Sequence, residues 1–192
     1  MFAREELSDE EAALFGKCGI FCGACDMHIG EARRHAKRMY EILESLNFED
    51  VGPLVFGADQ KSFEAFKELL ARFANSRDCG CCATGGPPMC PIKSCAAEKG
   101  FLTCAECDSL EECTDPSKPN TWNLARKEDF FKIISIRYNN WNLENLKEIR
   151  ERGYPRFLDT MNEKVEKGFR TGDVISKEKV FQKAVEKMRK GT

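Results

Sequence analysis

The sequence predicts a mainly α-helical protein with an irregular, cysteine-rich stretch between its helices. Apolar side chains recur at helical spacing before residue 75 and again after residue 127. Between residues 79 and 120, glycine and proline interrupt every long regular run, so metal-binding loops with small strands at most are expected there. Eight of the 11 cysteines fall in this stretch, which has few apolar side chains of its own.

Composition narrows the class of protein. The 192 residues are 42% hydrophobic and 32% charged, which is typical of a globular chain that can bury a core. The formal net charge of −2 argues against a nucleic-acid partner. The charged N-terminus resembles no signal peptide, and no apolar run is long enough to span a bilayer, so we expect a cytoplasmic protein without a membrane partner. In that reducing compartment, cysteines are expected to be metal ligands, reactive thiols or buried residues rather than disulfides.

Two amphipathic helices are predicted between the N-terminal cysteines and the later ones. Residues 31–46 place alanine, methionine, tyrosine and leucine side chains on one face, and residues 62–74 place phenylalanine and leucine side chains on one face. Asn47 and the stretch around Gly52 and Pro53 are expected to end the first helix, and Ser62 is expected to cap the second. The two helices can pack against each other and bring the separated cysteines together.

The C-terminal part is predicted to be helical throughout. Residues 128–138 fit a buried helix, although alternating apolar residues leave a strand as the alternative. Residues 142–152 form a second helix that Gly153 ends, a third helix follows, and Ser176 is expected to cap the last.

Two shorter helices complete the predicted organisation. Ser8 begins a capping-box pattern, and residues 92–99 fit a short helix inside the cysteine-rich stretch. We expect residues 1–120 to form a cysteine-rich metal-binding region with a helical insert at about 31–75. Residues 121–192 would form a helical tail packed on it, in one structural unit.

The spacing of the cysteines predicts metal sites. Two cysteines with two residues between them can both reach about 2.3 Å from one zinc ion without strain. The chain has three such pairs and five further cysteines between residues 18 and 113. The predicted metal ligands are Cys18, Cys22, Cys25, Cys79, Cys82, Cys90, Cys95, Cys104, Cys107 and Cys113.

Ten thiolates are enough for two sites of four sulfurs each. Two facing pairs give the most natural first site, namely Cys79, Cys82, Cys104 and Cys107. The N-terminal cysteines, joined by one of Cys90, Cys95 and Cys113, would form the second. We expect two zinc ions, and an iron–sulfur cluster is the alternative because it takes the same four-thiolate ligation.

The sequence does not decide the roles of two further residues near these sites. Cys81 adjoins Cys82, and adjacent side chains normally diverge, so Cys81 is left out of the ligand set. His28 follows Cys25 by three residues and fits either a ligand or a polar residue at a helix start.

Several motifs together resemble a known family. They are residues 18–25 (CGIFCGAC), residues 85–100 (GGPPMCPIKSCAAEKG), the pair Cys104 and Cys107, and residues 141–150 (WNLENLKEIR). The pattern, over about residues 14–160, is similar to that of small cysteine-rich bacterial and archaeal proteins known as a domain of unknown function. The resemblance implies zinc, or iron–sulfur, bound by these cysteines and no established activity. The chain departs from it by one extra cysteine between residues 79 and 82.

The expected function is metal binding, with the metal mainly structural. The protein would then serve as a binding or scaffold protein for a protein or small-molecule partner. An iron–sulfur redox protein, or an enzyme of thiol or sulfur chemistry that uses a spare cysteine such as Cys81, is the alternative.

Overall fold

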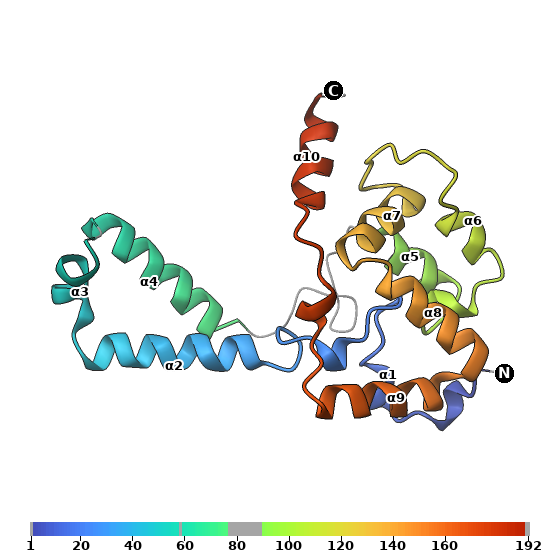
Figure 1. Ribbon diagram of the computed structural model, residues 1–192, viewed down its shortest axis with the longest axis horizontal. Coiled ribbons are helices and arrows are strands. Elements are labelled where there is room, and N and C mark those ends of the chain that lie inside the picture. Colours follow the sequence, from blue (N-terminus) through green and yellow to red (C-terminus); the bar gives the residue numbers. More distant parts are fainter. Residues whose placement is uncertain (1, 58, 77–89, 191–192) are drawn as a thin grey trace. The chain divides into compact units, whose positions relative to one another are not determined.

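The computed structural model describes residues 2–57, 59–76 and 90–190, and these ranges are almost entirely helices and their connections (Figure 1). No strand occurs within them, and a single isolated bridge joins Phe15 to Phe21. The prediction of a mainly α protein is therefore confirmed. No helix in these ranges is both long and apolar enough to cross a membrane.

The chain divides into two compact units. The larger unit consists of Met1–Cys25 together with Gly80–Thr192, and the smaller unit is Asp26–Cys79. The smaller unit contains α2 Glu31–Ser45, α3 Phe48–Phe56 and α4 Gln60–Ala74. The larger unit contains the α-helices α1 Asp9–Ala12, α5 Pro91–Glu98, α6 Leu110–Thr114, α7 Lys127–Arg137, α8 Trp141–Arg152, α9 Tyr154–Glu166 and α10 Val180–Lys190. Its 3-10 helices are η1 Arg4–Glu6, η2 Cys22–Ala24, η4 Cys104–Glu106 and η5 Thr171–Val174.

Local sequence signals set several of these helices. The capping box before α1 is complete: the Glu11 N–H donates to Ser8 Oγ at 3.2 Å, and the Ser8 N–H donates to Glu11 Oε2 at 2.8 Å. Residues 128–138, for which the sequence allowed a helix or a strand, form the helix α7. Helical winding suits it because α7 is covered on several sides, by α5, α6, α8 and α10.

Two local predictions in the smaller unit are wrong. Gly52 and Pro53 lie inside α3 instead of ending the first helix. Pro53 lies beyond the first turn of α3, and because it has no N–H it leaves out one helical hydrogen bond. Glycine suits position 52 because a Cβ there would lie 2.7 Å from the ring of Phe63. The cap of α4 is Asp59, whose carboxylate accepts the Ser62 N–H at 2.9 Å.

The main hydrophobic core of the larger unit joins chain segments far apart in sequence. Phe15 packs edge-on against Tyr154, with ring centroids 5.1 Å apart, and its ring is tilted against that of Phe157, with centroids 5.8 Å apart. Ile92, Leu102, Ala105 and Leu110 of the cysteine-rich stretch are buried in the same core. The apolar side chains of the C-terminal helices therefore supply what the cysteine-rich stretch lacks.

Candidate metal centre

The described part of the chain locates eight of the cysteines, and none of these eight is in a disulfide. Those that are buried are Cys18, Cys22 and Cys90. Those that are half-buried are Cys25, Cys95, Cys104, Cys107 and Cys113. The predicted ligands Cys79 and Cys82, together with Cys81, lie outside the described residues.

One cavity in the larger unit is bordered by four cysteines. The cavity has a volume of about 100 Å³, and its lining includes Cys95, Cys104, Cys107 and Cys113. These residues come from α5, from η4 with the residue that follows it, and from α6. Apolar side chains of α5, α6 and α7 complete the wall, namely Ile92, Leu110 and Phe131.

Two cysteine pairs each form a backbone turn of the same kind. In η4 the Cys107 N–H donates to the Cys104 carbonyl oxygen at 3.1 Å, and in η2 the Cys25 N–H donates to the Cys22 carbonyl oxygen at 3.0 Å. In both turns the alanine between the cysteines is fully buried, as Ala105 and as Ala24. A tight turn of this kind is how a two-residue cysteine spacing can direct two sulfurs to one metal centre.

Arg150 of α8 holds the turn at Cys104–Cys107 through its backbone. The Arg150 Nε donates to the Ala105 carbonyl oxygen at 2.8 Å, and Nη2 donates to the carbonyl oxygen of Cys107. The third nitrogen, Nη1, pairs with the Glu111 carboxylate. The planar guanidinium thereby fixes two carbonyls of the turn and one side chain of α6.

Tyr154 holds the same turn through hydrogen bonds to Glu106 and Thr103. Its hydroxyl donates to Glu106 Oε1 at 2.5 Å and accepts the Thr103 N–H at 3.2 Å. Burial, and then the hydrogen bond to Glu106, raise the pKa of Tyr154, so the phenol stays protonated and can donate. Both ends of the turn are thus fixed before any metal is considered.

Electrostatics in the cavity disfavour thiolate charge that nothing offsets. Burial raises the pKa of the Cys104 thiol, and the neighbouring cysteines, Cys18 first among them, raise it further. Two cations accompany the sulfurs: the Lys99 ammonium lies 3.8 Å from Cys107 Sγ, and thiolate charge at Cys113 and Cys95 raises the pKa of Lys127. Several thiolates can coexist in such a place when a metal ion offsets their charge.

The donor set fits a thiophilic metal, although the described residues alone form no single-ion site. Cysteine sulfurs are soft ligands, which suit zinc and iron–sulfur clusters. Within the described ranges, no three histidine, cysteine, aspartate or glutamate side chains are placed to hold one metal ion. The four sulfurs therefore border a space instead of meeting at a point.

The N-terminal cysteine loop is anchored to α8 and to the cavity turn. Asn142 Nδ2 donates to the Cys18 carbonyl oxygen at 3.2 Å, and Asn145 Nδ2 donates to the Gly19 carbonyl oxygen at 2.8 Å. The Cys104 N–H donates to the Lys17 carbonyl oxygen at 2.8 Å. Cys18 therefore adjoins the cavity without lining it.

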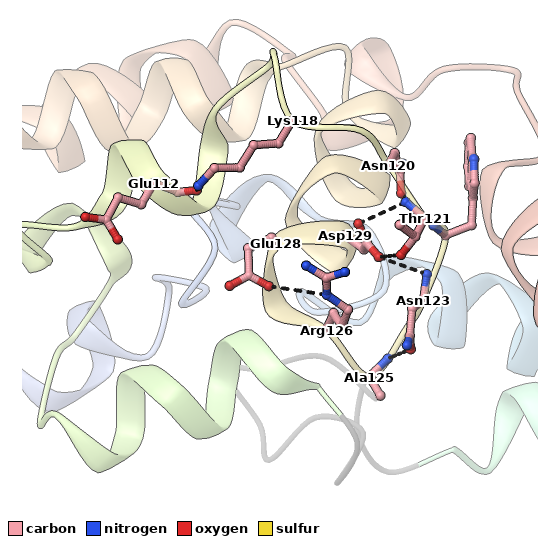
Figure 2. A network of polar contacts seen from close by, with 10 residues as sticks. Glu112, Lys118, Asn120, Thr121, Asn123, Ala125, Arg126, Glu128 and Asp129 are labelled. Atoms are coloured by element: carbon pink, nitrogen blue, oxygen red, sulfur yellow. Dashed lines mark hydrogen bonds and ion pairs between the residues drawn. The ribbon is translucent and has the colours of Figure 1, made fainter.

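Asp129 organises the loop that leads into α7, as Figure 2 shows. Its buried carboxylate accepts the Thr121 N–H at 3.1 Å, the Asn123 N–H at 3.2 Å and the Thr121 hydroxyl. Burial alone would raise the pKa of Asp129, but these hydrogen bonds outweigh it and hold the pKa below the usual value. The network fixes the start of α7, where Lys127 lines the cavity.

We expect Asp129→Asn to lower the free energy of unfolding by about 2 kcal/mol at neutral pH, because donors that now meet a buried carboxylate would meet an amide. A folded-state pKa below the unfolded value of about 3.9 stabilises the folded protein at pH values above that value. This contribution is lost as the pH falls from there through the folded-state pKa. In urea titrations, the difference between the two proteins should stay constant from pH 7 to about pH 5 and shrink below about pH 4. A difference that does not change with pH would contradict this role of the charge.

Sequence patterns miss the residues that support the cysteine turns. Arg150, Tyr154 and Asn142 lie on helices whose spacing marks them as ordinary surface or core positions. Two of them, Asn142 and Arg150, lie within the stretch 141–150 that contributed to the resemblance described above. That stretch was the one available signal, and it gave no role to any single residue.

Comparison with known proteins identifies a family and little else. No curated protein and no solved structure matches the chain. The family described as "Protein of unknown function (DUF3795)" matches residues 14–118, a shorter span than the 14–160 suggested by the motifs. All 11 cysteines lie within this span, whereas Arg150 and Tyr154 lie outside it. The chain belongs to the DUF3795 family of proteins of unknown function.

Proposed function

We propose that this protein binds a metal centre through the thiolates of Cys95, Cys104, Cys107 and Cys113. The observation that carries the proposal is their position around one cavity of about 100 Å³, although they come from different elements. Arg150 and Tyr154 support the central turn, and Lys99 and Lys127 stand beside the sulfurs. Thiols persist in a reducing compartment, so the proposal includes a cytoplasmic location.

The spacing of the sulfurs favours an iron–sulfur cluster over zinc. One zinc ion would need four sulfurs about 2.3 Å from a single point. A cluster with several iron and sulfide atoms takes its cysteine ligands farther apart, which suits sulfurs that border a cavity. Such a cluster would supply one-electron chemistry, whereas zinc would cross-link α5, η4 and α6 in a structural role.

The lysines beside the cavity suit either occupant. Four thiolates carry more negative charge than one zinc ion or a common cluster core neutralises, so a net negative charge remains on the bound centre. The ammonium groups of Lys99 and Lys127 reduce the cost of keeping that charge in a half-buried place. The residues of the chain therefore orient the cysteine ligands and balance their charge. The proposed partner of the protein is another protein or a small molecule.

The test is metal and sulfide analysis of native protein purified without oxygen, together with its absorption spectrum. We expect iron and sulfide, with absorbance at roughly 400 nm from sulfur-to-iron charge transfer. A colourless protein with stoichiometric zinc would keep the thiolate centre and exclude the cluster. Protein that folds and binds neither metal would overturn the proposal.

A further inference from the structure

The smaller unit leaves an apolar groove uncovered at one end of its helices. The groove lies between α2, α3 and α4, has a volume of about 530 Å³, and is lined almost entirely by apolar side chains. Those lining residues are Met39, Ile42, Leu43, Leu46, Phe48, Phe56, Ser62, Phe63 and Phe66. Buried side chains in the three helices are few, namely Ala36, Leu43 and Phe63, so much of the apolar surface faces outward.

The groove continues along α4 as an apolar stripe. Phe66, Leu69 and Phe73 follow one another at helical spacing and are 49%, 57% and 42% exposed. On the facing helix α2, Met39 and Leu46 are 47% and 61% exposed. α2 and α4 contact each other and diverge toward α3 (Figure 1), so the pair presents exposed apolar side chains from both helices on one face.

We propose that this face binds the same face of a second copy of the chain. Two helical hairpins that join their apolar stripes form a four-helix bundle, the common arrangement for helices with this pattern. A two-fold axis makes such an interface self-complementary, so one surface serves both copies. The face contains no residue of the cysteine cavity, and the dimer goes beyond the proposed metal function.

The exposed area agrees with what a stable dimer needs. At about 150–200 Å² for a large apolar side chain, the exposed fractions of Met39, Leu46, Phe56, Phe66, Leu69 and Phe73 amount to roughly 500–650 Å². With about two-thirds of a homodimer interface non-polar, this corresponds to roughly 800–1,000 Å² buried per copy, close to the standard size. The apolar part alone is as large as the largest patch on a typical monomer, about 300–600 Å².

Charge also permits two copies to meet. The acidic and basic side chains of α2, α3 and α4 balance, so like faces do not repel each other through a net charge. Charges beside the groove are paired within one copy: Lys67 bridges Glu44 at 2.6 Å and also contacts Glu49. Because Lys67 is already paired within its own copy, a neutral partner face suits this surface better than a highly charged one.

The test is the molar mass of the full-length protein, measured by light scattering during size-exclusion chromatography over a wide range of concentrations. We expect a dimer, and we expect Leu69→Glu with Phe73→Glu to raise its dissociation constant by roughly 100-fold or more, since each change occurs twice in the interface. The matched control is Val185→Glu with Met188→Glu, which adds the same charges at exposed apolar positions of α10 and should leave the dimer intact.

Three outcomes would overturn the proposal. A monomeric wild-type protein would mean that the face is covered by its own chain or by a different partner. A dimer that survives the two α4 changes would use another surface, and so would a dimer that the α10 changes disrupt. If the α4 variant loses helical circular dichroism, the single change Leu46→Glu replaces it in the test. Leu46 lies at the end of α2 and is 61% exposed, and its replacement should likewise weaken the dimer.

Discussion

Replacing Cys107 with serine is expected to remove the proposed metal centre from the cavity and to destabilise the larger unit. Serine keeps the size of the side chain but is a poor ligand for a thiophilic metal. Binding at structural thiolate sites contributes about 10 kcal/mol or more to folding, so losing one ligand of four should cost more than about 3 kcal/mol. Metal per chain and the free energy of unfolding, measured on anaerobically purified protein, give the result.

The other cavity cysteines provide the comparison. Cys95→Ser and Cys113→Ser should behave like Cys107→Ser, because all three residues line the same cavity. Cys81→Ser is the matched control, since spacing leaves Cys81 out of the ligand set. Full metal content and unchanged stability in all three cavity variants would refute the assignment of these ligands. Partial loss confined to one centre would show that further metal is held elsewhere in the chain.

Gly19→Ala is expected to cause the second large effect, a loss of about 3–5 kcal/mol of stability. Gly19 has a φ of +93°, and a Cβ at this position would lie 2.2 Å from the Asn142 carbonyl oxygen and 2.6 Å from Leu146 Cγ. The backbone of α8 cannot move away, because it is fixed by its own helical hydrogen bonds and its core contacts. The alanine therefore pushes the N-terminal cysteine loop off α8.

Gly100→Ala separates this crowding from backbone strain. Gly100 also has a positive φ, of +69°, but no atom lies within 4 Å of a Cβ placed there. We expect about 1 kcal/mol of destabilisation, from conformation alone. Urea titrations of both variants and the wild type measure the difference. Equal losses at the two positions would mean that contact with α8 is not what restricts Gly19.

Much of the helical structure follows from local signals. The apolar spacing over residues 31–46 and 62–74 becomes α2 and α4, and the Ser8 pattern becomes a complete capping box. These signals work because they depend on neighbours within one or two turns. Pro53 shows their limit: a residue that usually breaks helices is tolerated in α3, where close packing of Phe63 on Gly52 favours the helix.

The candidate site was less predictable, because its geometry depends on contacts distant in sequence. Spacing indicated that Cys104 and Cys107 form one turn, which the hydrogen bond across η4 bears out. Spacing grouped this turn with Cys79 and Cys82, which lie outside the described residues, so that grouping stays a prediction. Spacing did not indicate that Cys95 of α5 and Cys113 of α6 line one cavity with the turn. Arg150 reaches Ala105 across 45 positions, and no pattern in the sequence encodes that pairing.

The order of the chain has a consequence for how the protein is made. The anchor of the N-terminal loop, Asn142 bound to Cys18, joins residues 124 positions apart. During synthesis the cysteines therefore leave the ribosome well before the helices that will hold them, whereas the insert of residues 26–79 can already pack α2 on α4. Contacts of such long range are slow to form. The thiols remain accessible during that interval, and the proposed metal would best be delivered then.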